Sequence, residues 1–121
     1  LVIDFSQNCA GVLDLEMSAA RGVILHAKPA EMLNDSNGEK SRGNDGPAGS
    51  AYFANYRVPL FNMRYVFSGS GIERYRPNYT YFGGRYWSFT ATGRTEIKCV
   101  KFVPTMSIAK EDETGYIENR K

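Results

Sequence analysis

The sequence is short of the residues on which metal and nucleophilic sites depend. Its 121 residues include one histidine, His26, and two cysteines, Cys9 and Cys99. A single histidine excludes the HExxH and Cys2His2 zinc patterns, and no Ser-His-Asp or Cys-His motif surrounds it. We therefore expect no metal, no cofactor and an ordinary strand position for His26. Two distant cysteines make no disulfide framework, so both are expected to be free thiols.

Long apolar runs and dense clusters of one charge are also missing. No apolar stretch approaches the ~20 residues of a membrane-spanning helix. The net charge is +2, and the closest approach to a basic patch is Arg74 with Arg76. This pattern is typical of a solvated strand face, so neither a membrane nor a nucleic-acid partner is expected.

The residues that are present favour one β-domain. The length suits a single core, and the hydrophobic fraction of 42% argues against disorder. Aromatic residues reach 13%, which favours pleated, half-buried strands. No segment shows a helical period. Short strands separated by frequent turns predict an all-β antiparallel sandwich.

Alternating residues locate the expected strands. Leu13, Leu15 and Met17 share one face, with Asp14 and Glu16 opposite. The other expected strands are 23–28, 63–68, 79–81, 85–91 and 96–103, with Pro29 ending the first of these and turns at 21–22, 69–71, 83–84 and 92–93.

Two regions lack such a pattern. Residues 34–50 are polar and rich in turn formers, which predicts a surface loop within a long insertion over 34–62. Residues 35–39 faintly resemble a calcium loop, but the EF-hand pattern needs Glu where Gly46 stands, so a plain turn is favoured. The segment 110–121 is charged and reads as a linker. Because Leu1 lies inside an apolar run, we expect an excised fragment whose sandwich spans 1–109.

Carboxylates and aromatics are the candidate functional groups. Glycosidases need two carboxylates across the scissile bond. The available ones include Asp4, Asp14, Glu16, Glu31 and Glu73, but none forms a recognisable pair. Aromatics gather between Tyr75 and Phe89, where they either fill the core, the favoured interpretation, or stack on sugar rings. The candidate carbohydrate-contacting residues are Tyr79, Tyr81, Arg85, Tyr86 and Trp87.

Four segments carry a family resemblance. They are 2–11 (VIDFSQNCAG), 26–33 (HAKPAEML), 75–86 (YRPNYTYFGGRY) and 114–118 (TGYIE). In order and spacing they resemble the DFGQN-x-aG, h-a-E-x-L, y-x-P-x-F-t-y-h-G-F-R-Y and tGsFecs motifs of the bacterial α-L-rhamnosidases, glycoside hydrolase family 78. Each motif is weak alone, and together they are fairly specific.

Some positions depart from the family pattern. Ser6 stands where the family prefers Gly, Gly84 where it prefers Phe, and Met63 about where many members carry Asp. The region 34–62 aligns poorly. Polar contacts of the family are therefore not transferred to these positions, and the fold expectation stays in place.

The resemblance implies a concanavalin-like or jelly-roll sandwich placed before an (α/α)6 barrel. That barrel would carry the carboxylates that remove terminal α-L-rhamnose with inversion, so no catalytic residue is assigned to this chain. Asp4, Gln7, Asn8 and Glu31 are motif residues of uncertain role. Asp, Gln and Asn at a strand end most often bond turn backbone groups.

Two functions from different classes follow. In the first, the chain is a structural module that braces the catalytic domain. In the second, it is a carbohydrate-binding module for rhamnose-containing glycans. We expect a secreted or periplasmic parent enzyme, with a cytoplasmic one as the alternative. We also expect exposed apolar groups at Ala51–Phe53, at Val58–Phe61 and at Tyr116 and Ile117, where neighbouring domains would pack.

Overall fold

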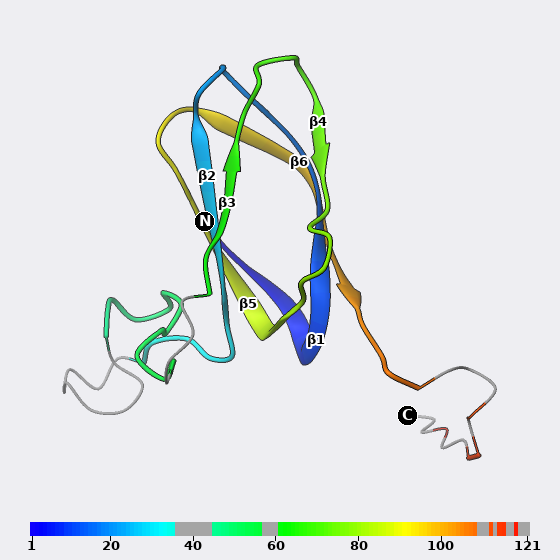
Figure 1. The fold of residues 1–121 in the computed structure, drawn as a ribbon. Coiled ribbons are helices and arrows are strands. Elements are labelled where there is room, and N and C mark those ends of the chain that lie inside the picture. Colours follow the sequence, from blue (N-terminus) through cyan, green and yellow to red (C-terminus); the bar gives the residue numbers. More distant parts are fainter. Residues whose placement is uncertain (36–44, 57–60, 109–111, 113, 116–117, 119–121) are drawn as a thin grey trace.

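The regular elements of the computed structural model are all antiparallel β-strands (Figure 1). The structure describes residues 1–35, 45–56, 61–108, 112, 114–115 and 118. The strands are β1 (Val2–Ala19), β2 (Ile24–Ala30), β3 (Met63–Val66), β4 (Glu73–Tyr75), β5 (Phe82–Ala91) and β6 (Thr95–Pro104). The all-β prediction is confirmed. In the described part of the chain, no helix has the length and hydropathy needed to cross a membrane.

The long strand β1 belongs to both layers of the fold. Its first half pairs with β5, which continues through β2 to β3. Its second half pairs with β6 on one side and β4 on the other. A register shift between Asp4 and Cys9 marks a bulge in β1, where strands bend and twist more strongly. The two layers therefore face each other across one core (Figure 1).

The core forms where the inward faces of the two layers meet. Leu13, Leu15 and Met17 of β1 are buried, as their alternation with Asp14 and Glu16 predicts. They join one cluster with Leu25 of β2 and Trp87 of β5. The remaining buried members of that cluster are Ala27, Met63, Phe67 and Phe89.

Two predicted strand breaks, at Pro29 and at Gly83–Gly84, are wrong. Pro29 does not end β2, because it pairs with Trp87 beyond the point where β3 stops. A proline is tolerated there, because a strand with one neighbour leaves one side without ladder bonds. Gly83 and Gly84 lie inside β5, and a Cβ on Gly84 would come within 3.1 Å of the Pro29 Cβ. Glycine therefore allows the close approach of β2 and β5.

The segment between β4 and β5 is not the strand predicted over 79–81. Tyr79 has φ 61°, in the left-handed region that bulky residues rarely adopt. The chain forms the short strand β4 earlier instead, where Tyr75 pairs with Leu15.

The described part of the 34–62 insertion is anchored to the domain. Leu33 bridges to Ala51, and Ala51 and Tyr52 are buried, so the expectation that they face solvent is wrong. The Nδ2 of buried Asn34 donates to the Asp45 carboxylate at 2.9 Å. That carboxylate also accepts the backbone N–H of Phe53 at 3.0 Å. These bonds satisfy polar groups that the tight packing would otherwise leave unpaired.

Other expectations fall on residues that are not described. They concern the calcium-like turn at 36–39, the apolar segment 58–60, and Tyr116 with Ile117. The domain boundary at residue 109 stays a prediction, with β6 ending at Pro104.

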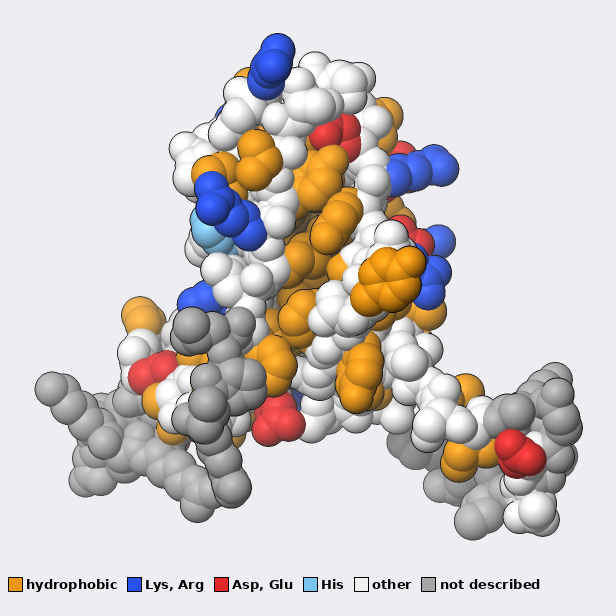
Figure 2. Space-filling model, in the orientation of Figure 1, with side chains coloured by type: hydrophobic (Ala, Val, Ile, Leu, Met, Phe, Trp, Pro, Cys, Tyr) orange, Lys and Arg blue, Asp and Glu red, His pale blue; other side chains and the backbone are white. Residues whose placement is uncertain are grey.

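A buried carboxylate organises the connection between the edge strands β3 and β4. Glu73 accepts hydrogen bonds from Tyr65 Oη at 2.7 Å, from Ser68 N at 3.1 Å and from Gly69 N at 3.0 Å. The bond from Tyr65 is the main reason that the pKa of Glu73 is lowered, despite burial. The rings of Tyr65 and Tyr75 approach to 4.9 Å between the two strands. Figure 2 shows a band of hydrophobic side chains between β3 and β4.

Candidate functional site

The aromatic cluster divides into buried and exposed members. Trp87 is fully buried, and its ring lies 5.4 Å from Phe82 and 5.7 Å from Phe102. Its Nε1 is buried without a hydrogen-bond partner in the described structure. The ring links the two layers and has no exposed surface on which a sugar could stack. The core interpretation of Trp87 therefore agrees with its position.

Arg85 and Asp4 form a paired site at the β1 bulge. Arg85 donates from Nε and Nη2 to the two Asp4 carboxylate oxygens, both at 2.8 Å. The Asp4 carboxylate also accepts the backbone N–H of Ser6 at 2.7 Å. The Arg85 hydrogen bond and then the Ser6 bond lower the pKa of Asp4 to about 2. The guanidinium lies 4.9 Å from the Tyr86 ring centroid.

This pairing gives Asp4 a structural task and restricts Arg85. A bidentate contact fixes the guanidinium plane and uses two of its five N–H donors. Three donors remain, on a side chain that is 40% exposed. Nothing near Asp4 in the sequence predicts a partner 81 positions away. The family preference for Gly at position 6 does give a local indication of the turn beside Asp4. Ser6 has φ 67°, a conformation that glycine adopts readily.

Tyr79 and Tyr81 are the exposed members of the cluster. Tyr79 is fully exposed, and Tyr81 is 64% exposed. Both lie on the segment between β4 and β5, which runs along the side of the molecule towards its lower end in Figure 1. They present aromatic surface to solvent, as the sequence-based alternative of a sugar platform requires.

The other motif residues lie near the same end of the sandwich. Gln7 and Asn8 are exposed within the β1 bulge, and Glu31 is exposed just after β2. Burial and then the charge of Glu31 raise the pKa of Tyr56 to about 12, so this phenol stays protonated at neutral pH. None of the hollows described below is lined by these motif residues or by Tyr79 and Tyr81.

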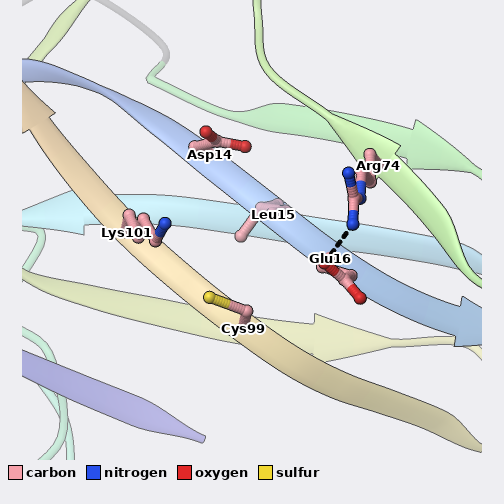
Figure 3. A pocket seen from close by; sticks show the side chains of 6 residues that line it. All are labelled: Asp14, Leu15, Glu16, Arg74, Cys99 and Lys101. Atoms are coloured by element: carbon pink, nitrogen blue, oxygen red, sulfur yellow. Dashed lines mark ion pairs between the residues drawn. The ribbon is translucent and has the colours of Figure 1, made fainter.

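A mixed-charge hollow occupies the outer face of the β4, β1 and β6 layer (Figure 3). It measures about 190 Å³ and is lined by Asp14, Leu15, Glu16, Arg74, Cys99 and Lys101. Arg74 reaches Glu16 at 3.2 Å, and both side chains are partly solvated. Such pairs contribute little to stability, and this arrangement agrees with the solvent-facing interpretation of Asp14 and Glu16.

Two further hollows have different linings. One of about 220 Å³ is mainly apolar and includes Leu1, Leu25, Phe89 and Ile97. Another of about 160 Å³ is formed by Lys28, Tyr56, Phe61 and Asn62. Both are smaller than the ~300–1,000 Å³ typical of ligand pockets, whereas a hollow of about 300 Å³ lined by Ser18, Ala19, Ala20, Arg94 and Glu96 reaches the lower limit of that range.

The thiols and acidic groups form no metal centre within the described residues. Cys9 and Cys99 are both free, as predicted. No group of three or more His, Cys, Asp or Glu side chains in this part of the chain is arranged to hold an ion.

Comparison with known proteins finds a family model and a related enzyme that match this chain. The family model for the "Bacterial alpha-L-rhamnosidase concanavalin-like domain" matches residues 1–106. An α-L-rhamnosidase from Streptomyces avermitilis is 33% identical over 89 residues. That match covers 74% of this chain and 8% of the Streptomyces protein. No solved structure matches the chain significantly.

Proposed function

Because this chain belongs to the family of bacterial α-L-rhamnosidase concanavalin-like domains, we propose that it is a non-catalytic sandwich domain that braces a catalytic domain. The parent enzyme would be an α-L-rhamnosidase that removes terminal α-L-rhamnose with inversion. One observation carries the proposal. The match to the family spans all six strands, whereas the aligned region is only 8% of the related enzyme.

The carboxylates of the domain support a non-catalytic role. Asp4 is held by Arg85, Glu16 contacts Arg74, and Glu73 binds the loop between β3 and β4. An inverting glycosidase needs two carboxyl groups about 6.5–9.5 Å apart, one kept protonated by a raised pKa. The pKa values of Asp4 and Glu73 are lowered instead. These two groups are therefore suited to structure, and poorly suited to the role of general acid.

An activity assay tests this proposal. The purified 121-residue chain should release no detectable chromophore from an aryl α-L-rhamnoside. The Asp14→Asn and Glu16→Gln variants, which alter the hollow of Figure 3, should behave identically. Turnover by the chain that either variant abolishes while the fold stays intact would overturn the non-catalytic assignment.

The carbohydrate-binding alternative has one observation in its favour, the exposure of Tyr79 and Tyr81. A site built on two such rings gains little over the cost of association, so affinity would be about millimolar. Chemical-shift titration with rhamnose-containing oligosaccharides distinguishes the two functions. Micromolar binding that Tyr79→Ala removes without unfolding the chain would favour the binding module over the brace.

A further inference from the structure

Two segments leave the sheet at the same end of the sandwich, on opposite sides of β1. Ala10 pairs with Gly83 at the start of β5, and its carbonyl accepts the backbone N–H of Thr105 at 2.9 Å. The segment 76–81 therefore enters β5 on one side of β1, and the segment 105–108 leaves β6 on the other. In Figure 1 this is the end from which the C-terminal part of the chain departs.

These two segments carry exposed hydrophobic side chains. Tyr79 and Tyr81 project from the first, while Met106 is 81% exposed and Ile108 is 65% exposed on the second. Figure 2 shows hydrophobic side chains both beside the segment that joins β4 to β5 and near the departing C-terminal segment. Large hydrophobic groups gathered on a soluble domain indicate an interaction site.

The same end also contains the strained backbone of the domain. Among the described residues, Ser6 and Tyr79 are the two non-glycine residues with positive φ, at 67° and 61°. Each such position costs of order 1–3 kcal/mol and persists when its surroundings require it. The Asp4 carboxylate supports Ser6, but Tyr79 is fully exposed, so the isolated domain supplies little packing against its ring.

We propose that this end, formed by residues 76–81 and 105–108, is the surface that docks onto the following domain of the same polypeptide. The proposal rests on the proposed bracing function. The family match reaches residue 106, within the second segment, and the aligned region makes up 8% of the related enzyme, which leaves most of that enzyme to other parts of its chain. The partner surface should be largely apolar, with acceptors for the Tyr79 and Tyr81 hydroxyls, because a phenol keeps a hydrogen-bond partner when buried.

An adjoining protein surface explains these features better than a glycan does. Met106 and Ile108 have no planar ring to stack on a sugar, and two donors of the nearby Arg85 are already engaged by Asp4. Neither Tyr79 nor Tyr81 lines any of the hollows described above. A docked neighbour would bury the two tyrosines and the two aliphatic side chains together.

Hydrogen exchange provides the test, using this chain and the longer polypeptide that extends through the following domain. Amides of 76–81 and 105–108 should exchange at least about tenfold more slowly in the longer polypeptide, whereas those of 66–72 at the opposite end should be unchanged. A Tyr79→Ser, Tyr81→Ser double variant should remove this added protection. The matched control is Val66→Ser with Ile72→Ser, which alters two similarly exposed hydrophobic residues away from the surface.

The outcomes separate the docking surface from the bracing function. If the amides of the two segments exchange at the same rate in both polypeptides, the docking proposal is wrong. Slower exchange elsewhere on the sandwich would leave the bracing function intact and would show that the following domain contacts another surface. Protection of Tyr79 and Tyr81 by added rhamnose-containing oligosaccharide, in the 121-residue chain alone, would overturn the docking assignment in favour of carbohydrate binding.

Discussion

At the scale of single residues, the β1 bulge concentrates the polar features of the domain. Asp4 binds Arg85 from another strand and the Ser6 amide from its own turn. The carboxylate therefore ties β5 to the bulge while capping a backbone group that the bend would leave unpaired. This geometry gives the motif residue Asp4 a structural role at the bulge.

The left-handed conformation of Ser6 leads to a stability prediction. A Ser6→Gly substitution should stabilise the chain by about 0.5–1 kcal/mol, because glycine adopts positive φ without steric cost. Ser88, inside β5, provides the control, since glycine there should destabilise by about 0.5–1 kcal/mol. Urea unfolding of both variants checks the prediction. A loss of stability on Ser6→Gly would mean that its side chain contributes more than the strain costs.

The lowered pKa of Asp4 predicts a dependence of stability on pH. An unfolded aspartate titrates near 3.9, whereas the folded value is about 2. The Asp4–Arg85 contribution should thus be fully present above about pH 4 and lost as the pH falls towards 2. Carboxyl NMR titration of Asp4, with urea midpoints across that range, measures both effects. In Asp4→Asn this component of the pH dependence should vanish, and an Asp4 titration near 4 would contradict the pairing.

Local sequence predicts some residue roles and misses others for a physical reason. Alternation correctly places Leu13 inside and Asp14 outside, because side chains on a strand alternate between its two faces. It cannot pair Asp4 with Arg85, because that contact depends on which strands become neighbours. The positive φ of Tyr79 could not be predicted either, because no glycine marks that position in the sequence.

At the scale of elements, strands with clear alternation were located well and glycine-rich ones were not. The predicted strands over 63–68 and 96–103 correspond closely to β3 and β6. Gly83 and Gly84 suggested a break, but glycine is also used where two strands approach closely, as β5 approaches Pro29. The bulge that lets β1 serve both layers has no simple sequence pattern.

Two glycines at the junction of β1, β5 and β6 provide a matched test of this packing. A Cβ on Gly11 would collide with the backbone carbonyl oxygen of Val103 in β6, whereas one on Gly83 would meet nothing within 4 Å. Gly11→Ala should therefore cost about 1–3 kcal/mol through overpacking. Gly83→Ala should be neutral or stabilising by up to about 1 kcal/mol. Thermal unfolding of the two variants checks the difference, and equal melting temperatures would contradict the register of β1 and β6.

At the scale of the whole molecule, the sandwich combines a filled core with exposed hydrophobic groups on its surface. Its core is filled by residues from both layers, including Trp87, and several of its carboxylates bind within the domain. The hydrophobic groups at 76–81 and 105–108 have no comparable partner inside the domain. Such exposed hydrophobic groups are what the proposed docking surface requires.

The central claim is that the sandwich braces a catalytic domain, and thermal inactivation of the longer enzyme tests it most directly. Gly11→Ala should lower the temperature at which rhamnosidase activity is lost, while kcat and KM at low temperature stay unchanged. Gly83→Ala should leave the inactivation temperature, kcat and KM unchanged. If Gly11→Ala unfolds the sandwich earlier but activity is lost at the original temperature, the two domains are uncoupled and the bracing function is wrong.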